Sequence, residues 1–279
     1  MLNFNALQVD GLKEVLQNIA SSCDYLQIDF FVVGAVARNI WYVHGGKESS
    51  GTNDIDFGVY VSDHKTYNKL KAYLKEQFLY TQSLDNVFGL DTPDGKRIDL
   101  LPFGEIAQNG EVVLEGRGMT KIKLDGFEEV YLHGSIKTSI EKEIYKACSI
   151  PGIVILKLIA FDDRPNRRIK DIKDISLICK YYPEIETNLI WEENNDLYSE
   201  DKSHEEVGLI VLGREIKKIV KPNQNLNERL KAILDKAISG KSRVLELMIN
   251  DRINETLEEK ANILTVSYTH LTLPTILLV

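Results

Sequence analysis

Residues 30–57 read FFVVGAVARNIWYVHGGKESSGTNDIDF. The apolar run Phe30–Val33 predicts a buried strand, and Gly34 after it permits a tight turn. Ala35–Val43 has the pattern of a helix, and a polar loop leads from it to Asp54-Ile55-Asp56. This order of strand, turn, helix and acidic strand predicts a unit that mixes helices with a sheet.

The acidic residues of this unit suggest a metal site. Asp54 and Asp56 stand two residues apart, so in a strand both side chains point to one face. Asp99 lies in a second strand-like run, Ile98–Phe103, and reaches the same edge if the two strands pair. Alone, an Asp-x-Asp pair is more often a turn feature. With Asp99, it can hold two Mg²⁺ ions that clamp the attacking and leaving oxygens of an in-line displacement.

The start of the predicted helix offers a seat for phosphates. Its N–H groups and its positive end would face an anion. Gly34 lets the backbone approach a ligand closely, and Arg38 could add a charge-assisted contact one turn into the helix. We therefore predict Gly34, Ala35 and Arg38 as nucleotide-binding residues.

A second block with distinctive chemistry begins at Pro151, which suits the first turn of a helix. Lys157 interrupts an otherwise apolar run, which is costly unless the ammonium meets an anion such as a triphosphate. Asp171 and Asp174 follow with a spacing that places both on one helix face. The alternatives without a role in binding are a lysine that snorkels from a core helix to water, and acidic residues that stabilise a helix N-terminus. A basic patch separates the two parts: Arg164, Arg167, Arg168 and Lys170.

Three blocks carry a family resemblance: VVGAVARNIW, then TNDIDF with RIDLLPF, and ILKLIAFDDRPNRRIKDIKDI. The chain resembles nucleotidyltransferases of the DNA polymerase β superfamily, and within it the AbiEii/AbiGii-type toxin nucleotidyltransferases. It departs from the family pattern at Ala35, where Ser or Gly is usual. The resemblance implies an α+β fold, with a small mixed-sheet core followed by a helical C-terminal domain.

The same resemblance implies an activity and a site. The enzyme would use Mg²⁺, two ions in all, to move NMP from an NTP to an acceptor hydroxyl. The acceptor would be RNA, at the tRNA 3′ end, in a toxin–antitoxin system with a cognate antitoxin protein as partner. The resemblance implies that Asp54, Asp56 and Asp99 are catalytic metal ligands and that Asp99 also helps to deprotonate the acceptor. It implies that Lys157, with Asp171 or Asp174, binds the nucleotide. It further implies substrate contacts from Arg164, Arg167 and Arg168.

Two other functions share these motifs. A small-molecule nucleotidyltransferase of the antibiotic-modifying type would use the same metal chemistry. A non-catalytic module that binds a nucleotide or an antitoxin could use the same fold, although it would not need three acids at one strand edge.

Composition limits the remaining possibilities. The 279-residue chain has a formal charge of −8, which argues against a general nucleic-acid coat, so any RNA contact must use a local patch. Its three cysteines are isolated, which does not support zinc and fits a reducing cytosol. The first ten residues lack the pattern of a signal peptide. We expect a cytoplasmic protein that does not contact a membrane.

The organisation along the chain follows from these blocks. We predict a catalytic core over residues 1–150 and a helical domain over 151–264 that completes the site. The stretch VSYTHLTLPT, which begins at Val266, resembles a translated sequencing adapter, so we expect residues 265–279 to be non-native.

Local signals predict further elements of the core. Asp63 should cap a helix, and the turn Pro93-Asp94-Gly95 should close a hairpin. We predict strands at Glu128–Leu132 and Glu143–Ser149.

Overall fold

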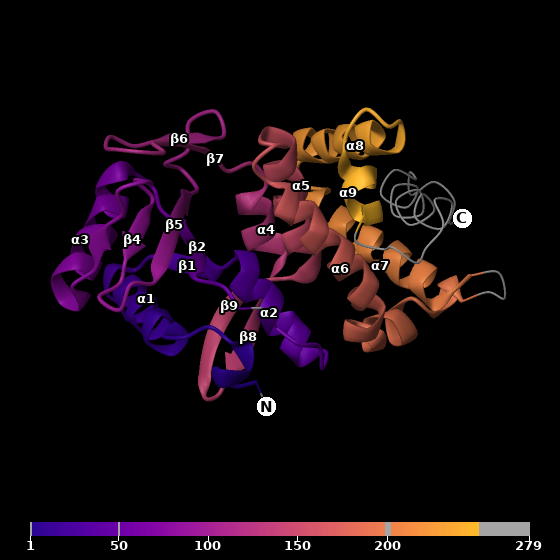
Figure 1. The fold of residues 1–279 in the computed structure, drawn as a ribbon, viewed down its shortest axis with the longest axis horizontal. Helices are drawn as coiled ribbons and strands as arrows, with labels where there is room; N and C mark the ends of the chain where they lie inside the picture. Colours follow the sequence, from indigo (N-terminus) through magenta and orange to yellow (C-terminus); the bar gives the residue numbers. More distant parts are fainter. Residues whose placement is uncertain (1, 50, 199–201, 251–279) are drawn as a thin grey trace. The chain divides into compact units, whose positions relative to one another are not determined.

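The structure is a computed structural model that describes residues 2–49, 51–198 and 202–250 (Figure 1). The predicted adapter-derived tail, residues 265–279, lies outside the described residues. The chain divides into two compact units, unit 1 from Met1 to Ser149 and unit 2 from Ile150 onwards. Its mixed parallel and antiparallel sheet and its helical C-terminal part confirm the predicted α+β fold class.

Unit 1 is built on a mixed sheet. Within the described residues, seven strands pair in the order β3-β4-β5-β2-β1-β9-β8. The strands are β1 (Asp29–Val32), β2 (Asp54–Tyr60), β3 (Thr81–Gln82), β4 (Gly89–Asp91), β5 (Arg97–Phe103), β8 (Ser135–Ile140) and β9 (Glu143–Cys148). Strand β2 pairs antiparallel with β1 and parallel with β5, so β2 lies between the first strand and the predicted third-acid strand.

Helices and a small hairpin complete unit 1. They are η1 (Asn5–Leu7), α1 (Leu12–Leu26), α2 (Gly34–His44), α3 (His64–Phe78), α4 (Phe127–His133), and the paired strands β6 (Glu111–Val113) and β7 (Lys121–Lys123). Figure 1 shows β6 and β7 standing apart from the main sheet. Helix α3 begins as predicted, because the Asp63 carboxylate accepts a hydrogen bond of 2.7 Å from the Thr66 N–H.

The two faces of β2 have different surroundings. Ile55, Phe57 and Val59 are fully buried on one face. On the other face, Tyr60 follows the two aspartates and joins an aromatic cluster with Phe103 of β5 and Tyr131 of α4. The apolar packing of both faces fixes which residues of β2 point where, because a slip of one residue would exchange them.

One predicted strand is wrong. The segment Glu128–Leu132 belongs to helix α4. Gly126 precedes this helix in the left-handed conformation (φ +83°), and Glu128 with Glu129 lies in its first turn, where acidic side chains favour the positive end of the helix. Only Val130 and Tyr131 of the segment are buried, so a short helix suffices to bury its apolar face.

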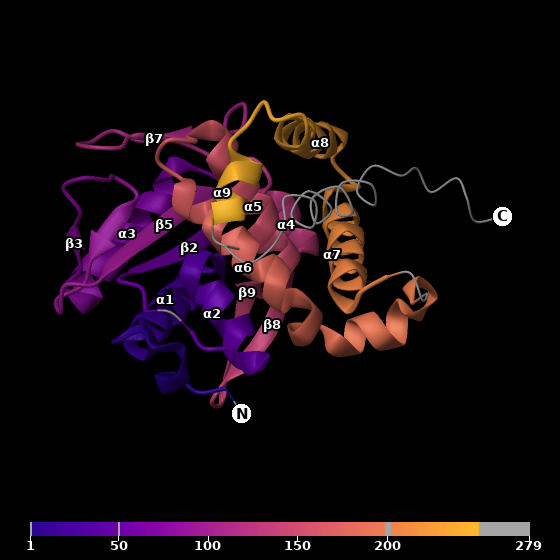
Figure 2. The same cartoon turned by 45° about the vertical axis from the view of Figure 1, so that its right-hand side comes forward.

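Unit 2 is helical within the described residues. Its helices are α5 (Ile150–Asp163), α6 (Ile169–Ile185), η2 (Leu189–Glu193), η3 (Asn195–Leu197), α7 (His204–Val220), α8 (Gln224–Ile238) and α9 (Val244–Asn250). Helix α5 is apolar around most of its surface, and it can therefore pack against three helices, α6, α7 and α8 (Figure 2). None of the helices in the described ranges has the length and apolarity needed to cross a membrane.

Lys71 on α3 makes the stability of unit 1 depend on pH. Its ammonium is buried and donates to the Val87 carbonyl, and burial, with a smaller contribution from Lys75, lowers its pKa to about 8. Between about pH 8 and pH 10.5 the unfolded chain therefore holds a proton that the folded chain has lost. We expect the free energy of unfolding to rise across this window by on the order of 2 kcal/mol.

Urea unfolding at several pH values measures this rise. Lys71→Met should flatten it, whereas Lys69→Met, at an exposed position on the same helix, should leave it unchanged. An equal slope in the Lys71 variant would show that another group titrates.

Candidate active site

Three carboxylates lie on one face of two neighbouring strands. Asp54 is exposed and Asp56 half-buried at the start of β2, and their spacing directs both to the same face. In the parallel pairing of β2 with β5, Asp56 is in register with Asp99, and Asp54 is in register with Arg97. Paired strands are about 4.8 Å apart, so Asp56 and Asp99 are immediate neighbours across the sheet.

The turn after β1 lies directly against Asp56. Gly34 has φ +64°, and a Cβ atom on it would stand 2.2 Å from Oδ2 of Asp56. The Val33 N–H donates to the Asp56 carbonyl over 3.0 Å, which holds the end of β1 beside β2. Val33, the residue before α2, makes no side-chain cap hydrogen bond, and the first N–H groups of a helix have no partner inside the helix. The turn thus brings the acidic strand and the helix N-terminus together.

This close approach explains why position 34 is glycine. In Gly34→Ala the methyl group would displace the Asp56 carboxylate, so we expect the NMP transfer predicted from the sequence to fall by at least about tenfold. Gly46→Ala is the matched control, because Gly46 has a similar φ of +69° but its added methyl group would meet none of the described residues within 4 Å. Backbone strain should cost each variant about 1 kcal/mol of stability. Equal activity in the two variants would contradict the contact.

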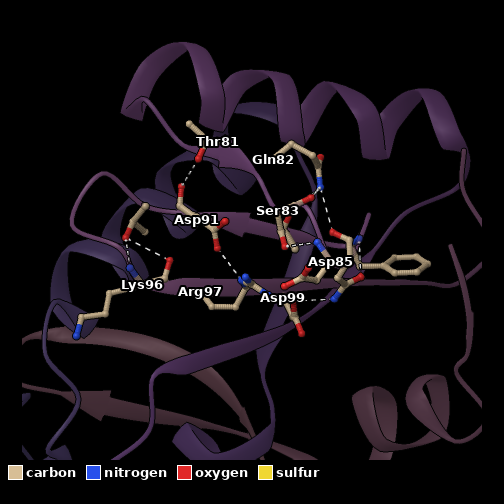
Figure 3. Close-up of polar contacts among 12 residues, drawn as sticks. Thr81, Gln82, Ser83, Asp85, Asp91, Lys96, Arg97 and Asp99 are labelled. Carbon is tan, nitrogen blue, oxygen red and sulfur yellow. Dashed lines mark hydrogen bonds and ion pairs between the residues drawn. The ribbon is translucent and has the colours of Figure 1, made fainter. Parts of the chain in front are cut away.

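A residue that sequence analysis missed holds Asp99. The Asn86 amide Nδ2 donates to Oδ1 of Asp99 over 3.0 Å, and its Oδ1 accepts from the Phe88 N–H over 2.9 Å. The dashed line at Asp99 in Figure 3 marks the first of these bonds, and Gln82 braces the same loop by donating to the Gly89 carbonyl. Asn86 is buried in the loop before β4, so no pattern along the chain connects it with Asp99.

Asn86→Ala should therefore leave Asp99 loosely oriented. Replacing a residue that orients a metal ligand typically lowers metal affinity or activity by about 10- to 100-fold, and we expect a loss in that range for the NMP transfer predicted from the sequence. Asn18→Ala, which removes an amide that donates to Tyr80 in the same unit, is the control and should retain activity. Thermal unfolding of both variants separates a local effect from a loss of folded protein.

Arg97 adds a cation beside the carboxylates. It stands two residues before Asp99 on β5, and its Nε donates to Oδ1 of Asp91 on β4 over 2.6 Å (Figure 3). This hydrogen bond raises the pKa of the Arg97 guanidinium. The bond to Asp91 directs the arginine side chain towards β4 and links β4 with β5 next to Asp99.

The donor set fits Mg²⁺. No group of three or more His, Cys, Asp or Glu side chains in the described ranges forms a ready-made metal cluster. Mg²⁺, however, usually takes one or two carboxylates and completes its octahedron with water and substrate phosphates. Asp56 and its register partner Asp99 are neighbours, and Asp54 shares their face. Asp56 and Asp99 could therefore supply the carboxylates of an Mg²⁺ site, with Asp54 on the same face of the sheet.

The second predicted cluster forms within unit 2. The Lys157 ammonium on α5 bonds Oδ1 of Asp171 over 2.8 Å and Oδ2 of Asp174 over 2.7 Å, both on α6. The three side chains are between 10% and 12% exposed. The anion that Lys157 needs is thus supplied by this pair of carboxylates, and the spacing predicted for one helix face is observed. A nucleotide contact from this triad stays a prediction.

The remaining predicted residues have diverse surroundings. Arg167 and Arg168 are exposed in the turn between α5 and α6, with Arg164 half-buried before them, so the basic patch faces solvent. Ala35 is half-buried at the start of α2. Arg38 is buried, 4% exposed, and donates to Oδ1 of Asn39 over 3.1 Å. Its predicted phosphate contact is not tested by these contacts.

Comparisons with solved structures find distant likenesses. No family model matches the chain, and no curated protein matches it. The solution structure of the antibiotic-resistance factor ANT(2'')-Ia is 14% identical and covers 66% of this chain and 91% of its own, with a TM-score of 0.39. An antigenic nucleotidyltransferase-like protein from Paracoccidioides brasiliensis is 16% identical, covering 70% and 92%, with a TM-score of 0.38.

A crystal structure of ANT(2")-Ia in complex with adenylyl-2"-tobramycin is 15% identical, covers 66% of this chain and 92% of its own, and has a TM-score of 0.37. These neighbours are nucleotidyltransferases or nucleotidyltransferase-like. At TM-scores below 0.5 they carry no weight for what this chain acts on, so its function has to be argued from its own residues.

Proposed function

We propose that this protein is a Mg²⁺-dependent nucleotidyltransferase that moves NMP from an NTP onto an acceptor hydroxyl. The observation that carries the proposal is the contact between Gly34 and Asp56, which joins a helix N-terminus to a carboxylate in register with Asp99. A phosphate seat and a set of metal ligands at one place are what phosphoryl transfer requires, because its catalysis is mainly positioning and charge stabilisation.

The residues of unit 1 divide the work in this proposal. The N–H groups at the start of α2, around Gly34 and Ala35, bind phosphate oxygens. Asp54, Asp56 and Asp99 hold Mg²⁺, which when bound neutralises charge on the phosphates. Asp99 accepts the proton of the acceptor hydroxyl while Asn86 holds one of its oxygens in place. The acceptor oxygen forms a bond to the α-phosphorus, the bond from that phosphorus to the bridging oxygen breaks, and pyrophosphate leaves.

For the acceptor we propose RNA, at the tRNA 3′ end, in a toxin–antitoxin system. Two observations support this choice. The sequence blocks around Gly34, Asp56 and Lys157 resemble toxin nucleotidyltransferases, and the turn before α6 exposes Arg167 and Arg168. Exposed arginines suit the phosphates of an RNA backbone.

A transfer assay tests both levels of the proposal. The protein is incubated with Mg²⁺, one α-labelled NTP at a time, and either total tRNA or a panel of aminoglycosides. Label on the RNA 3′ end is the expected result. Label on an aminoglycoside would replace the RNA acceptor but keep the activity, and NTP binding without any transfer would show a non-catalytic module. The Mg²⁺ requirement is checked with EDTA.

A further inference from the structure

Unit 2 carries an exposed aromatic platform on the short helix η2 and the segment that follows it. The Trp191 and Tyr198 rings stack with their centroids 4.0 Å apart and their planes at 6°. His204, at the start of α7, lies alongside, and its Nδ1 is 3.0 Å from the Tyr198 hydroxyl. Trp191 is nevertheless 52% exposed. Since Tyr198 covers one face of the indole, the other face accounts for much of this exposure.

Buried side chains and hydrogen bonds hold the platform in place. Ile190 and Leu197 are buried beside the two stacked rings. Arg214 on α7 donates to Oδ1 of Asn194 over 2.9 Å and to both carboxylate oxygens of Asp196 over 3.2 and 3.0 Å. These bonds fix the turn between Trp191 and Tyr198. A preorganised aromatic surface loses little conformational entropy when it binds a ligand.

The surroundings of the platform are strongly acidic. The described residues of 184–198 and 202–206 include seven Asp and Glu and one Lys, and Arg214 of α7 pairs with one of these acids, Asp196. Glu192 and Glu193 directly follow the tryptophan and are exposed, and Glu205 directly follows His204. Such a rim repels the phosphates of a nucleic acid, which argues against a base-stacking role. It attracts a cation, and the open face of an indole is the best aromatic surface for binding one.

We propose that the open face of Trp191 binds an arginine-bearing segment of a protein partner. The guanidinium plane stacks on the indole while its N–H groups reach the carboxylates of Glu192 or Glu193. Arginine fits better than lysine because its flat, weakly hydrated guanidinium can stack on the indole and donate two hydrogen bonds to one carboxylate. This surface belongs to unit 2 and is independent of the proposed transfer reaction.

Fluorescence anisotropy with short labelled peptides tests the proposal. The probe is an octapeptide that alternates Arg and Gly, compared with its Lys counterpart and with a single-stranded RNA octamer. We expect the Arg peptide to bind and the Lys peptide to bind more weakly. Any RNA binding, which the proposed transfer site would provide, should be the same in Trp191→Ala and in the parent protein. Trp191→Ala should weaken Arg-peptide binding by roughly tenfold, and reversing charge in Glu192→Lys/Glu193→Lys should weaken it as well.

A matched variant controls for nonspecific binding of the peptide to exposed aromatic side chains. Tyr25 in unit 1 is 68% exposed and stacks on Tyr73 with centroids 4.8 Å apart, so Tyr25→Ala removes a similar exposed stack and should leave binding unchanged. Circular dichroism and urea unfolding of Trp191→Ala verify that the variant folds.

Three outcomes would overturn the proposal. The first is Arg-peptide binding that is equal in Trp191→Ala and the parent protein, or absent from both. The second is RNA binding that depends on Trp191. The third is self-association that Trp191→Ala abolishes, seen by sedimentation, which would make the platform a contact between copies.

Discussion

Asp56→Asn is expected to lower NMP transfer by about 10³-fold or more, equivalent to about 4 kcal/mol of transition-state stabilisation. Asn keeps the shape of the side chain that lies against Gly34 but removes the negative charge that a metal ion needs. The expected loss is large because Asp56 stands between the helix N-terminus and Asp99, at the centre of the proposed site. Single-turnover transfer with saturating NTP measures the chemical step directly.

The control for this variant is Asp24→Asn, which removes a carboxylate from an exposed position on α1 and should keep full activity. Urea unfolding should give Asp56→Asn a stability within about 1 kcal/mol of the parent, because its neighbours are retained. Transfer that persists in a folded Asp56 variant would rule out the proposed metal site. Loss of transfer together with unfolding would be resolved by Asp54→Asn, at a more exposed position of the same strand.

Lys157→Met should have the largest effect on stability, a loss of about 3–5 kcal/mol in the free energy of unfolding. The substitution removes the ammonium that bonds both Asp171 and Asp174, two buried carboxylates, while Arg168 stays 3.7 Å from Oδ2 of Asp171. The loss should appear as a lower urea midpoint with an unchanged dependence on urea, because the surface exposed on unfolding is the same.

Two further variants isolate the ionic contribution. Lys218→Met removes a lysine of an exposed pair, 2.5 Å from Glu215 on α7, and should cost at most about 1 kcal/mol. The triple variant Lys157→Met/Asp171→Asn/Asp174→Asn should recover much of the stability lost in Lys157→Met, because the two buried negative charges that Lys157 neutralised are then removed as well. If the triple variant is less stable than the single one, packing of the lysine stem outweighs the charges.

Much of unit 1 could be predicted because its signals are local. The i, i+2 spacing of Asp54 and Asp56 decides their common face once β2 forms, and the Asp63 cap depends on an N–H only three residues away. The hairpin of β4 and β5 is closed by a turn whose residues favour it. The prediction of a strand in place of helix α4 is wrong because the segment is short and buries only two residues, so periodicity carries little information.

The residues that support the candidate site could not be predicted in this way. Asn86 and Asp99 are separated by a hairpin, and their bond depends on how the loop before β4 folds over β5. The sequence indicated that Lys157 needs an anion, but a triphosphate and a pair of carboxylates satisfy the same requirement. The packing of α5 on α6 places the carboxylates of Asp171 and Asp174 there.

By itself, the sequence determined the order of strand, turn, helix and acidic strand, and the chemical types gathered at residues 34, 54, 56 and 99. Only the tertiary structure decided that β2 and β5 run parallel with Asp56 beside Asp99, and that Gly34 has room for nothing larger than hydrogen next to Asp56. The physical reason is the distance along the chain over which each interaction acts. Side-chain direction within a strand follows from backbone geometry, whereas the register between strands far apart in the chain follows from the packing of the whole unit.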